Sequence, residues 1–304
     1  MIGRLRSRRV GPRRSGQPAS PLAVAPLHDG QMFPPGHFYS PVPDLSDIRA
    51  RETDIFRPDR PLGGIDLRDQ AQLTLFRSLT SVVADLRLTP HPTPGRRYWY
   101  DNGWFTYGDG ATYALLLRAF EPKRVVEIGS GFSSALLLDV NDAFFDGAIE
   151  CVFVEPFPER LWSVLDDGDE SLCRVIEAPA QEVGIGLVAD LDAGDILFID
   201  STHVVKTGSD VEWIFRELLP AVPIGTLVHF HDVFYPFEYP AEWVFEGRGW
   251  NEVYMLRSFL QFNDAFEIML FSRYLVYEHH AVVANRWPQL LTDPGASIWL
   301  RRVK

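Results

Sequence analysis

Two short polar clusters in this 304-residue sequence have the residue types needed to remove a proton or to hold a metal ion. Asp200 and His203 are three positions apart, with Lys206 three positions later, and His231 and Asp232 are adjacent. Each cluster directly follows a short apolar run. Carboxylate and imidazole groups are ligands that Mg²⁺ or a similar divalent ion accepts, and imidazole is the commonest general base. We expect His203 to be the catalytic base.

Each of these residues also has an ordinary structural interpretation. Asp200 could be a turn or helix-capping acid, and His231 a turn residue that caps the strand before it. Lys206 is an alternative base, an electrostatic holder of the acceptor, or a solvent-exposed lysine at the approach to a helix. These alternatives stay open on the residues alone.

The elements that must position the clusters begin at residues 124–134. An apolar run at 125–128 is interrupted by Gly129 and Gly131, and a second apolar stretch follows at 135–138. This is the pattern of a strand, a tight turn and a helix. Glycines let the backbone approach a ligand, and the free N–H groups at a helix start favour polar or anionic atoms. A purely structural strand-to-helix turn is the alternative.

Two acids strengthen the cofactor interpretation of this turn. Glu155 ends the next apolar run, where the second strand of a nucleotide-binding unit carries an acid for the ribose hydroxyls. Glu127 lies between two apolar residues just before Gly129, where a dinucleotide-binding strand is normally apolar. An acid at that place could face the amino group of a methionine moiety.

The run Val126-Glu127-Ile128-Gly129-Ser130-Gly131, with Glu155 after it, resembles the first two motifs of the class I S-adenosylmethionine-dependent methyltransferases. The resemblance covers roughly residues 95–304 and implies S-adenosylmethionine as the cofactor. Residues after the third expected strand match the place where the family holds the adenine ring. The implied cofactor-binding residues are Glu127, Gly129, Ser130, Gly131, Glu155, Ala180 and Gln181.

The polar clusters resemble those of the metal-dependent O-methyltransferases, which include catechol O-methyltransferase and enzymes that methylate macrolide sugars. That group has an acid after the fourth strand, a basic residue three positions later and an acidic pair after the fifth. Asp200, His203 and Asp232 match this pattern, and His231 departs from it because an acid is usual there. The resemblance implies Asp200, His231 and Asp232 as ligands of Mg²⁺ or a similar cation.

Apolar runs near 174–176, 196–199 and 226–230 continue an alternation of strands with helices. This order predicts an α/β fold, a doubly wound, Rossmann-like and mostly parallel sheet with helices on both faces. Helices are expected near 67–87, 110–120 and 251–261. The resemblance implies seven strands, with expected strands near 265–271 and 297–302 forming an antiparallel hairpin at one edge.

Residues 1–20 contain six arginines and no acid, which predicts a disordered basic tail. The pair Arg8-Arg9 is a poor export signal, because the stretch after it is short and proline-rich. We expect an N-terminal arm and helix over residues 21–95 and the methyltransferase domain over residues 96–304.

Charge and composition limit the partners. Removing the six arginines of the tail from the 29 basic residues leaves 23 against 41 acidic ones, a net charge of −18. Phosphate binding needs a basic surface, so no nucleic acid partner is expected. No apolar run approaches the length of a membrane span. Two cysteines cannot form a disulfide framework, which fits a cytoplasmic protein. The oligomeric state stays open.

Two aromatic stretches complete the set of candidate features. Residues 98–107 are either a hydrophobic latch onto the domain or one wall of a substrate pocket, because aromatic faces stack on sugars and planar rings. Residues 235–240, with Trp243 and Trp250, form a proline-stiffened loop directly after Asp232. A loop at that place can close over an acceptor.

Three classes of function remain, and the leading one is an O-methyltransferase, divalent-metal-assisted, that acts on a hydroxyl of a sugar or small natural product. The second is a catalytically degenerate protein that binds S-adenosylmethionine, which the presence of His203 and Asp232 disfavours. The third is a nicotinamide-dependent oxidoreductase, which Glu127 and the His231-Asp232 pair disfavour. Methyl transfer to nitrogen or carbon is a further alternative.

Overall fold

A computed structural model describes residues 32–304, and the chain divides into two compact units, residues 1–50 and 51–304. In the first unit, helix α1 (Leu45–Ala50) begins after Asp44, whose carboxylate accepts a hydrogen bond of 2.8 Å from the backbone N–H of Ser46. The predicted basic tail, the Arg8-Arg9 pair and the first residues of the predicted arm lie outside the described residues. The predicted boundaries at residues 20 and 95 stay predictions.

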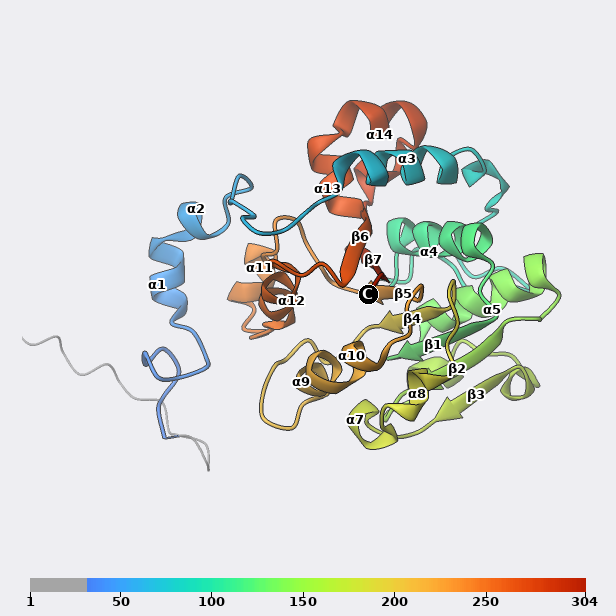
Figure 1. Cartoon of the computed structure of the whole chain (residues 1–304), viewed down its shortest axis with the longest axis horizontal. Coiled ribbons are helices and arrows are strands. Elements are labelled where there is room, and N and C mark those ends of the chain that lie inside the picture. Colours follow the sequence, from blue (N-terminus) through green and yellow to red (C-terminus); the bar gives the residue numbers. More distant parts are fainter. Residues whose placement is uncertain (1–31) are drawn as a thin grey trace, which may run out of the picture. The chain divides into compact units, whose positions relative to one another are not determined.

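The second unit contains one seven-stranded sheet with the order β3-β2-β1-β4-β5-β7-β6 (Figure 1). The first five strands are mutually parallel, and β7 is antiparallel to both of its neighbours. The predicted doubly wound, mostly parallel sheet with an antiparallel last strand is confirmed. The strands are β1 (Arg124–Ile128), β2 (Glu150–Val154), β3 (Cys173–Ile176), β4 (Ile196–Ile199), β5 (Leu227–Phe230), β6 (Phe266–Phe271) and β7 (Ile298–Arg302).

Helices flank this sheet, and α4 packs on α5 beside it (Figure 1). The longer helices are α3 (Asp69–Leu79), α4 (Tyr107–Phe120), α5 (Phe132–Phe145), α12 (Glu252–Leu260), α13 (Ser272–Glu278) and α14 (His280–Arg286). The shorter ones are α2 (Glu52–Ile55), α6 (Glu159–Trp162), α7 (Ala180–Val183), α8 (Gly186–Ala189), α9 (Asp210–Trp213), α10 (Leu219–Ala221), α11 (Ala241–Phe245) and α15 (Gln289–Thr292). A π-helical segment (Ile214–Leu218) joins α9 to α10, and 3₁₀ turns lie at Val83–Asp85 and Asp169–Ser171.

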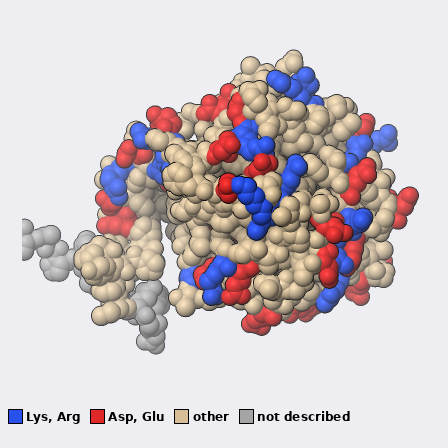
Figure 2. Space-filling view, viewed as in Figure 1, with Lys and Arg blue, Asp and Glu red and all other residues tan. Residues whose placement is uncertain are grey.

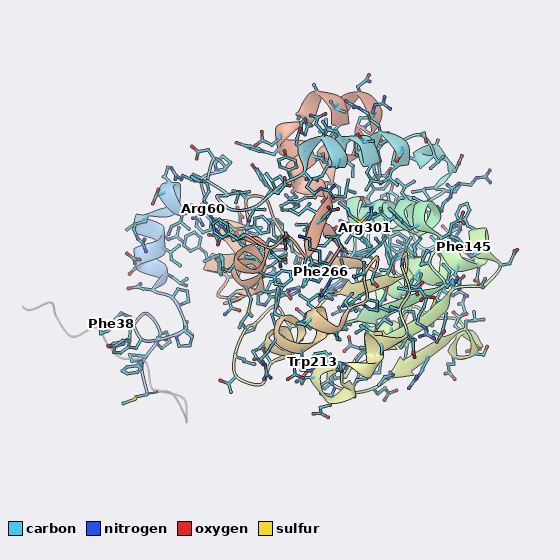
Figure 3. The ribbon with its side chains drawn as sticks, in the orientation of Figure 1. Phe38, Arg60, Phe145, Trp213, Phe266 and Arg301 are labelled. Atoms are coloured by element: carbon cyan, nitrogen blue, oxygen red, sulfur yellow. The ribbon has the colours of Figure 1, made fainter. Side chains whose placement is uncertain are left out.

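The central strands form because their side chains are buried on both faces of the sheet. Every residue of β4 and β5 is buried, which is typical of parallel strands covered on both sides by helices. At the edge, β6 and β7 carry Phe266 and Arg301 (Figure 3), and the guanidinium of Arg302 lies 5.0 Å above the Phe266 ring. None of the described helices is long and apolar enough to cross a membrane.

The strand order reverses between β1 and β4, and this switch point positions the site. The chain runs from β1 outward to β2 and β3, then returns to the other side of β1 with β4 and β5. The ends of β1 and β4 are in direct contact, because the N–H of Asp200 donates to the Ile128 carbonyl over 2.8 Å. Open α/β sheets bind ligands in the crevice at such a point.

Gly129 is required at this contact for two physical reasons. Its backbone is in the left-handed region, with a φ of 83°, and a Cβ there would lie 2.0 Å from the Asp200 carbonyl oxygen. Any side chain at position 129 would therefore push the cofactor turn away from the loop that carries Asp200.

One expected helix differs from the structure, and three observed helices were not expected. The helix expected over residues 67–87 ends at Leu79, and a single 3₁₀ turn follows at Val83–Asp85. The apolar residues after position 79 still pack against the core. Their spacing matched that of a helix, but it reflects the burial of one side of a turn. The three helices α13–α15 between β6 and β7 have no counterpart among the elements expected from the sequence.

Candidate functional site

The two polar clusters meet at the carboxyl ends of β4 and β5, as predicted from their positions after the strands. His203 Nε2 lies 3.3 Å from Asp200 Oδ1 and 3.6 Å from Asp232 Oδ2. His231 Nε2 lies 3.6 Å from the other oxygen of Asp232. His203 and His231 are buried, whereas 37% of the Asp200 side chain is exposed to solvent. The site therefore consists of two carboxylates that share two imidazoles.

A third carboxylate, Glu252 at the start of α12, completes this cluster. Its Oε2 lies 2.8 Å from His203 Nδ1, and its Oε1 accepts a 2.8 Å hydrogen bond from the hydroxyl of Ser201. Only 2% of Glu252 is exposed. Its role was not predicted, because an acid in the first turn of a helix is an ordinary feature of helices.

The loop that carries His203 is fixed to the start of α12 by its backbone. The His203 carbonyl accepts from the N–H groups of Asn251 and Glu252, at 3.0 and 3.1 Å. The Asn251 side chain exchanges two hydrogen bonds with the backbone of Val205, at 2.6 and 3.3 Å. A segment nearly fifty residues further along the chain thus sets the position of the imidazole.

His203 and Asp232 both have left-handed backbone conformations, with φ values of 60° and 55°. Non-glycine residues rarely adopt this region, and each costs on the order of 1 kcal/mol. Such residues persist where surrounding contacts hold them, and they concentrate at functional sites. His203 and Asp232 are two such residues, and the side chains of both belong to the cluster. Their backbone conformations therefore support a functional role for the two loops.

The charges around His203 affect its pKa more than its burial does. Burial alone would lower the pKa of His203, but hydrogen bonds to Asp200 and Glu252, together with their charges, raise that pKa well above its usual range. Burial would likewise raise the pKa of Asp200, yet His231 and His203 lower it to about 2. These interactions therefore favour the carboxylate form of Asp200 and the protonated form of His203.

His231 lies deeper, between this cluster and the aromatic residues. Burial opposes its charge, but Asp232, Asp200 and Asp109 together raise the pKa of His231 above its usual value. Its ring centre is 5.4 Å from that of Phe105. Among residues 32–304, His231 Nδ1 is one of the few buried polar atoms with no hydrogen-bond partner. His231 thus has a nitrogen free for a ligand or a water molecule.

The predicted metal ligands Asp200, His231 and Asp232 were tested against the geometry of their donor atoms. No group of three or more His, Cys, Asp or Glu residues within the described part of the chain is arranged to hold a metal ion. His203 Nε2 lies 3.3 Å from Asp200 Oδ1 and 3.6 Å from Asp232 Oδ2. The donor set as arranged does not fit a bound cation.

The cofactor side of the site surrounds Gly129 and Gly131. Glu155 accepts from the backbone N–H of Ser130 over 3.2 Å with one oxygen and from that of Phe157 over 2.9 Å with the other. Each carboxylate oxygen can accept a further hydrogen bond. In the described chain, Ser130 Oγ and Gln181 Oε1 are buried without a partner. Free acceptors and an orphaned hydroxyl fit a nucleoside with its ribose and amino groups.

Glu127 is completely buried beneath the same turn. Its carboxyl accepts hydrogen bonds from Tyr113 Oη at 3.1 Å and from the hydroxyls of Ser133 and Ser134. Burial raises the pKa of Glu127 to about 8, although the three hydroxyl groups oppose the shift. Glu127 is therefore mostly protonated at pH 7, and its role toward a methionine amino group stays a prediction.

The remaining predicted residues lie at the margins of the site. Ala180 is buried at the start of α7, and the amide of Gln181 donates to the Gly208 carbonyl over 3.4 Å. Lys206 is exposed, and its ammonium makes no hydrogen bond or ion pair with any residue that the structure describes. This placement fits the solvent-exposed interpretation of Lys206 better than that of a second base.

The two aromatic stretches divide between packing and surface. Tyr98 and Phe105 are buried, and the Tyr98 hydroxyl donates back to the Phe105 carbonyl over 2.9 Å. Trp104 is 61% exposed and lies under the guanidinium of Arg160, at 3.8 Å. From the later stretch, the Trp250 ring is 4.5 Å from that of His203. Both stretches therefore reach the histidines of the site.

Two surface cavities, of about 430 and 410 Å³, contain none of the predicted site residues. Active sites are identified by convergent polar groups with shifted pKa values more directly than by volume alone. These groups are at the ends of β4 and β5. Acidic and basic side chains are interspersed over the visible face of residues 51–304 (Figure 2).

The family model described as a methyltransferase domain matches residues 126–233, from β1 to just beyond β5. These residues form a methyltransferase domain. The class I resemblance is confirmed, and the match favours methyl transfer over nicotinamide-dependent oxidation. The methyltransferase domain contains both polar clusters, from Asp200 to Asp232, whereas Glu252 lies outside the matched segment.

The known proteins that are similar to the chain include one relative from an archaeon and several solved structures. An uncharacterized protein of Archaeoglobus fulgidus is 41% identical over 133 residues, which are 42% of this chain and 60% of that protein. The match thus spans less than two thirds of the relative.

The solved structures share less sequence. SAH-bound PaMTH1 from Podospora anserina is 16% identical, with coverage of 87% and 99% of the two chains and a TM-score of 0.44. The O-methyltransferase TomG from Streptomyces achromogenes, involved in tomaymycin synthesis, is 15% identical, with 85% and 96% coverage and a TM-score of 0.41. A putative caffeoyl-CoA O-methyltransferase from Staphylococcus aureus is 18% identical, with 78% and 100% coverage and a TM-score of 0.41. Similarity at this level transfers no activity.

Proposed function

We propose that the protein is an S-adenosylmethionine-dependent O-methyltransferase that acts on a hydroxyl of a small molecule, either a sugar or another natural product. The observation that carries the proposal is the position of His203 in a methyltransferase domain. Its Nε2 lies between Asp200 and Asp232 at the switch point, beside the glycine turn.

The cofactor would be held by the residues around this turn. Glu155 would accept from the ribose hydroxyls, and Ser130 and Gln181 offer buried polar atoms that lack partners in the described chain. Gly129 and Gly131 keep the turn open to the methionine end. When bound, S-adenosylmethionine supplies the electrophilic methyl group.

The chain's own residues would act on the acceptor. An alcohol is a poor nucleophile until its proton is removed, and a positioned base typically contributes about 10²–10⁴-fold. In its neutral form, His203 keeps the proton on Nδ1, which donates to Glu252, and leaves Nε2 to take the proton of the acceptor hydroxyl. Asp200 and Asp232 then stabilise the resulting imidazolium. Trp250, which is partly exposed beside the His203 ring, would provide apolar surface for the acceptor's carbon skeleton.

No step of this proposal uses a divalent cation, because no group of three or more His, Cys, Asp or Glu residues in the described part of the chain is arranged to hold one. The metal-assisted form of the reaction stays a prediction. A chelator would abolish turnover if that form operates, and Mg²⁺ or Mn²⁺ would restore it.

The proposed function is tested in two stages. Calorimetry with S-adenosylhomocysteine should show saturable binding to the purified protein. A methyl-transfer screen with a labelled cofactor should then find acceptors among sugars and hydroxylated natural products, with the methyl group on oxygen. Binding without transfer to any acceptor would favour a degenerate S-adenosylmethionine-binding protein, and absence of binding would refute both assignments.

A further inference from the structure

We propose that Trp243 and Trp250 form a recognition site for a cationic group on the acceptor, and that the guanidinium of Arg248 lies in the place of that group. The ligand class is a small hydroxyl compound that carries a protonated amine or a quaternary ammonium. Its role as acceptor rests on the proposed function. Binding of a cation by the two rings does not depend on methyl transfer.

The first argument comes from the arrangement of the two rings. Trp243 belongs to α11, and Trp250 lies just before α12. Their ring centres are 5.4 Å apart and their planes meet at 85°, an edge-to-face arrangement. The central guanidinium carbon of Arg248 lies 4.0 Å from the centre of the Trp243 ring and 5.0 Å from that of Trp250. Cations are attracted to aromatic faces within about 6 Å, and most strongly to indole, so one cation is held here by two indoles.

The second argument comes from the distance to the proposed base. The Trp250 ring centre is 4.5 Å from that of His203, and both tryptophans are partly exposed. Trp243 also packs edge-to-face on Phe234, at 5.1 Å, in the loop that begins at Asp232. The guanidinium and the imidazole thus contact the same indole. A small molecule with its cation on the tryptophans can bring a hydroxyl group to His203.

The third argument comes from the way Arg248 is held. Among residues 32–304, its side chain makes one ion pair, with Glu246 at 2.9 Å, and the Glu246 side chain is 56% exposed. Ion pairs between exposed side chains add little stability. The backbone of Arg248 is fixed separately, because its N–H donates to the Trp243 carbonyl over 3.3 Å. A competing cation can therefore displace the side chain while the turn stays folded.

The charge of the chain favours a cationic ligand. Beyond residue 20 there are 23 basic and 41 acidic residues, a net charge of −18. A field of one sign raises the local concentration of ligands of the opposite sign. Because a neutral acceptor could also stack on the indole faces, the test must separate charge from shape.

The binding test uses choline and its uncharged isostere 3,3-dimethylbutan-1-ol, which share a hydroxyl group and a shape but differ in charge. In ligand-detected NMR titrations, the wild-type protein should bind choline about 2–30-fold more tightly than the isostere, the range expected for cation–π contacts. Arg248→Ala frees both rings and should bind choline more tightly than the wild type does. Arg216→Ala is the matched control, because Arg216 is also paired with a glutamate but contacts no aromatic ring in the described chain.

The rings themselves are tested with Trp243→Leu and Trp250→Leu, since leucine is apolar but has no π face. Each should reduce the preference for choline over the isostere. Trp243→Phe keeps a ring against Phe234 and should retain part of the preference, and Trp162→Leu, a half-buried tryptophan on α6, is the control. Circular dichroism during thermal unfolding shows whether each variant is folded. Equal binding of choline and the isostere by both the wild type and Arg248→Ala would overturn the proposal, as would a preference that survives in both leucine variants.

The acceptor test compares amino sugars with their N-acetyl derivatives, which lack the charge of the amine. In the methyl-transfer assay, the amino sugar should have the lower KM, and Trp243→Leu should remove that difference with less effect on kcat. Transfer with equal KM values for the two forms would retain the proposed function and overturn the assignment of the rings to the acceptor. Should no acceptor be methylated, the choline titrations still decide whether the rings bind a cation.

Discussion

Glu127 on β1 and Asp200 after β4 lie on neighbouring strands of the sheet, and their surroundings differ in one respect. Glu127 meets only hydroxyl groups, from Tyr113, Ser133 and Ser134, and its pKa rises to about 8 mainly because of burial. Asp200 is near two imidazoles, and its pKa falls to about 2 although burial opposes the fall. Hydroxyl groups stabilise a buried carboxylate less than cations do.

The difference divides the site into two functional halves. The half around Glu127 and Glu155 has few fixed charges and spare hydrogen-bond acceptors, which suits binding of a cofactor. The half around Asp200, His203 and Asp232 has fixed and opposed charges, which suits proton transfer. Four predictions separate the halves.

The largest effect is expected from His203→Ala. Turnover should fall about 10²–10⁴-fold, the usual contribution of a general base, while the affinity for S-adenosylhomocysteine stays near that of the wild type. Steady-state kinetics and calorimetry on the same preparation measure both quantities. His280→Ala serves as the control. If cofactor affinity falls together with turnover, the two halves are not separable.

Glu155→Ala tests the other half. Loss of charged hydrogen bonds to the ribose should weaken S-adenosylhomocysteine binding by about 1–3 kcal/mol, with less effect on the chemical step at saturating cofactor. Because Glu155 also holds the N–H groups of Ser130 and Phe157, Glu155→Gln should be compared. Glu159→Ala, at an exposed residue nearby, is the control. Unchanged binding in Glu155→Ala would exclude that residue from the cofactor site.

Glu127→Gln should change how stability depends on pH. The folded protein keeps the Glu127 proton up to about pH 8, whereas the unfolded chain loses it near 4.5, so the free energy of unfolding should fall as pH rises through this window. Over pH 6–8 the fall attributable to this group is about 2 kcal/mol. Denaturant unfolding of the variant should show a smaller slope with pH. Identical slopes would mean that Glu127 is ionised in the folded protein.

The smallest effect is the position of the acidic limb of the pH profile. A base must be neutral to accept a proton, and the carboxylates around His203 raise its pKa well above 6.5. Turnover should therefore still increase with pH above 6.5. The acid limb of kcat, measured between pH 6 and 9 in buffers of constant ionic strength, checks this. A midpoint at or below 6.5 would show that the surrounding charges do not raise the pKa of His203 during turnover.

The sequence predicted most of the sheet because buried parallel strands are short, apolar and bounded by turns. It also predicted that Asp200 and Asp232 would meet, since residues directly after adjacent parallel strands share one edge. Both inferences need only local pattern and the order of elements.

Glu252 could not be found in this way. Its role depends on the packing of α12 against the loop after β4, and no local pattern distinguishes it from a helix-terminal acid. Likewise, the ionisation of Glu127 depends on which groups surround it. The sequence pattern of an acid between apolar residues is identical whether a hydroxyl or a cation contacts that acid. Helices α13–α15 were missed because no local cue separated their short apolar stretches from loop.

The hydrogen bonds between His203 and the start of α12 also impose an order on assembly. The glycine turn, Glu127 and Glu155 lie within a segment of about thirty residues, so this part of the cofactor half is present soon after β2 has been synthesised. His203 and Glu252 are 49 positions apart. Translation proceeds at about 5–20 residues per second, so Glu252 is synthesised several seconds after the loop that carries His203. A nascent chain therefore passes through a stage in which the cofactor turn exists and the catalytic imidazole has no fixed direction.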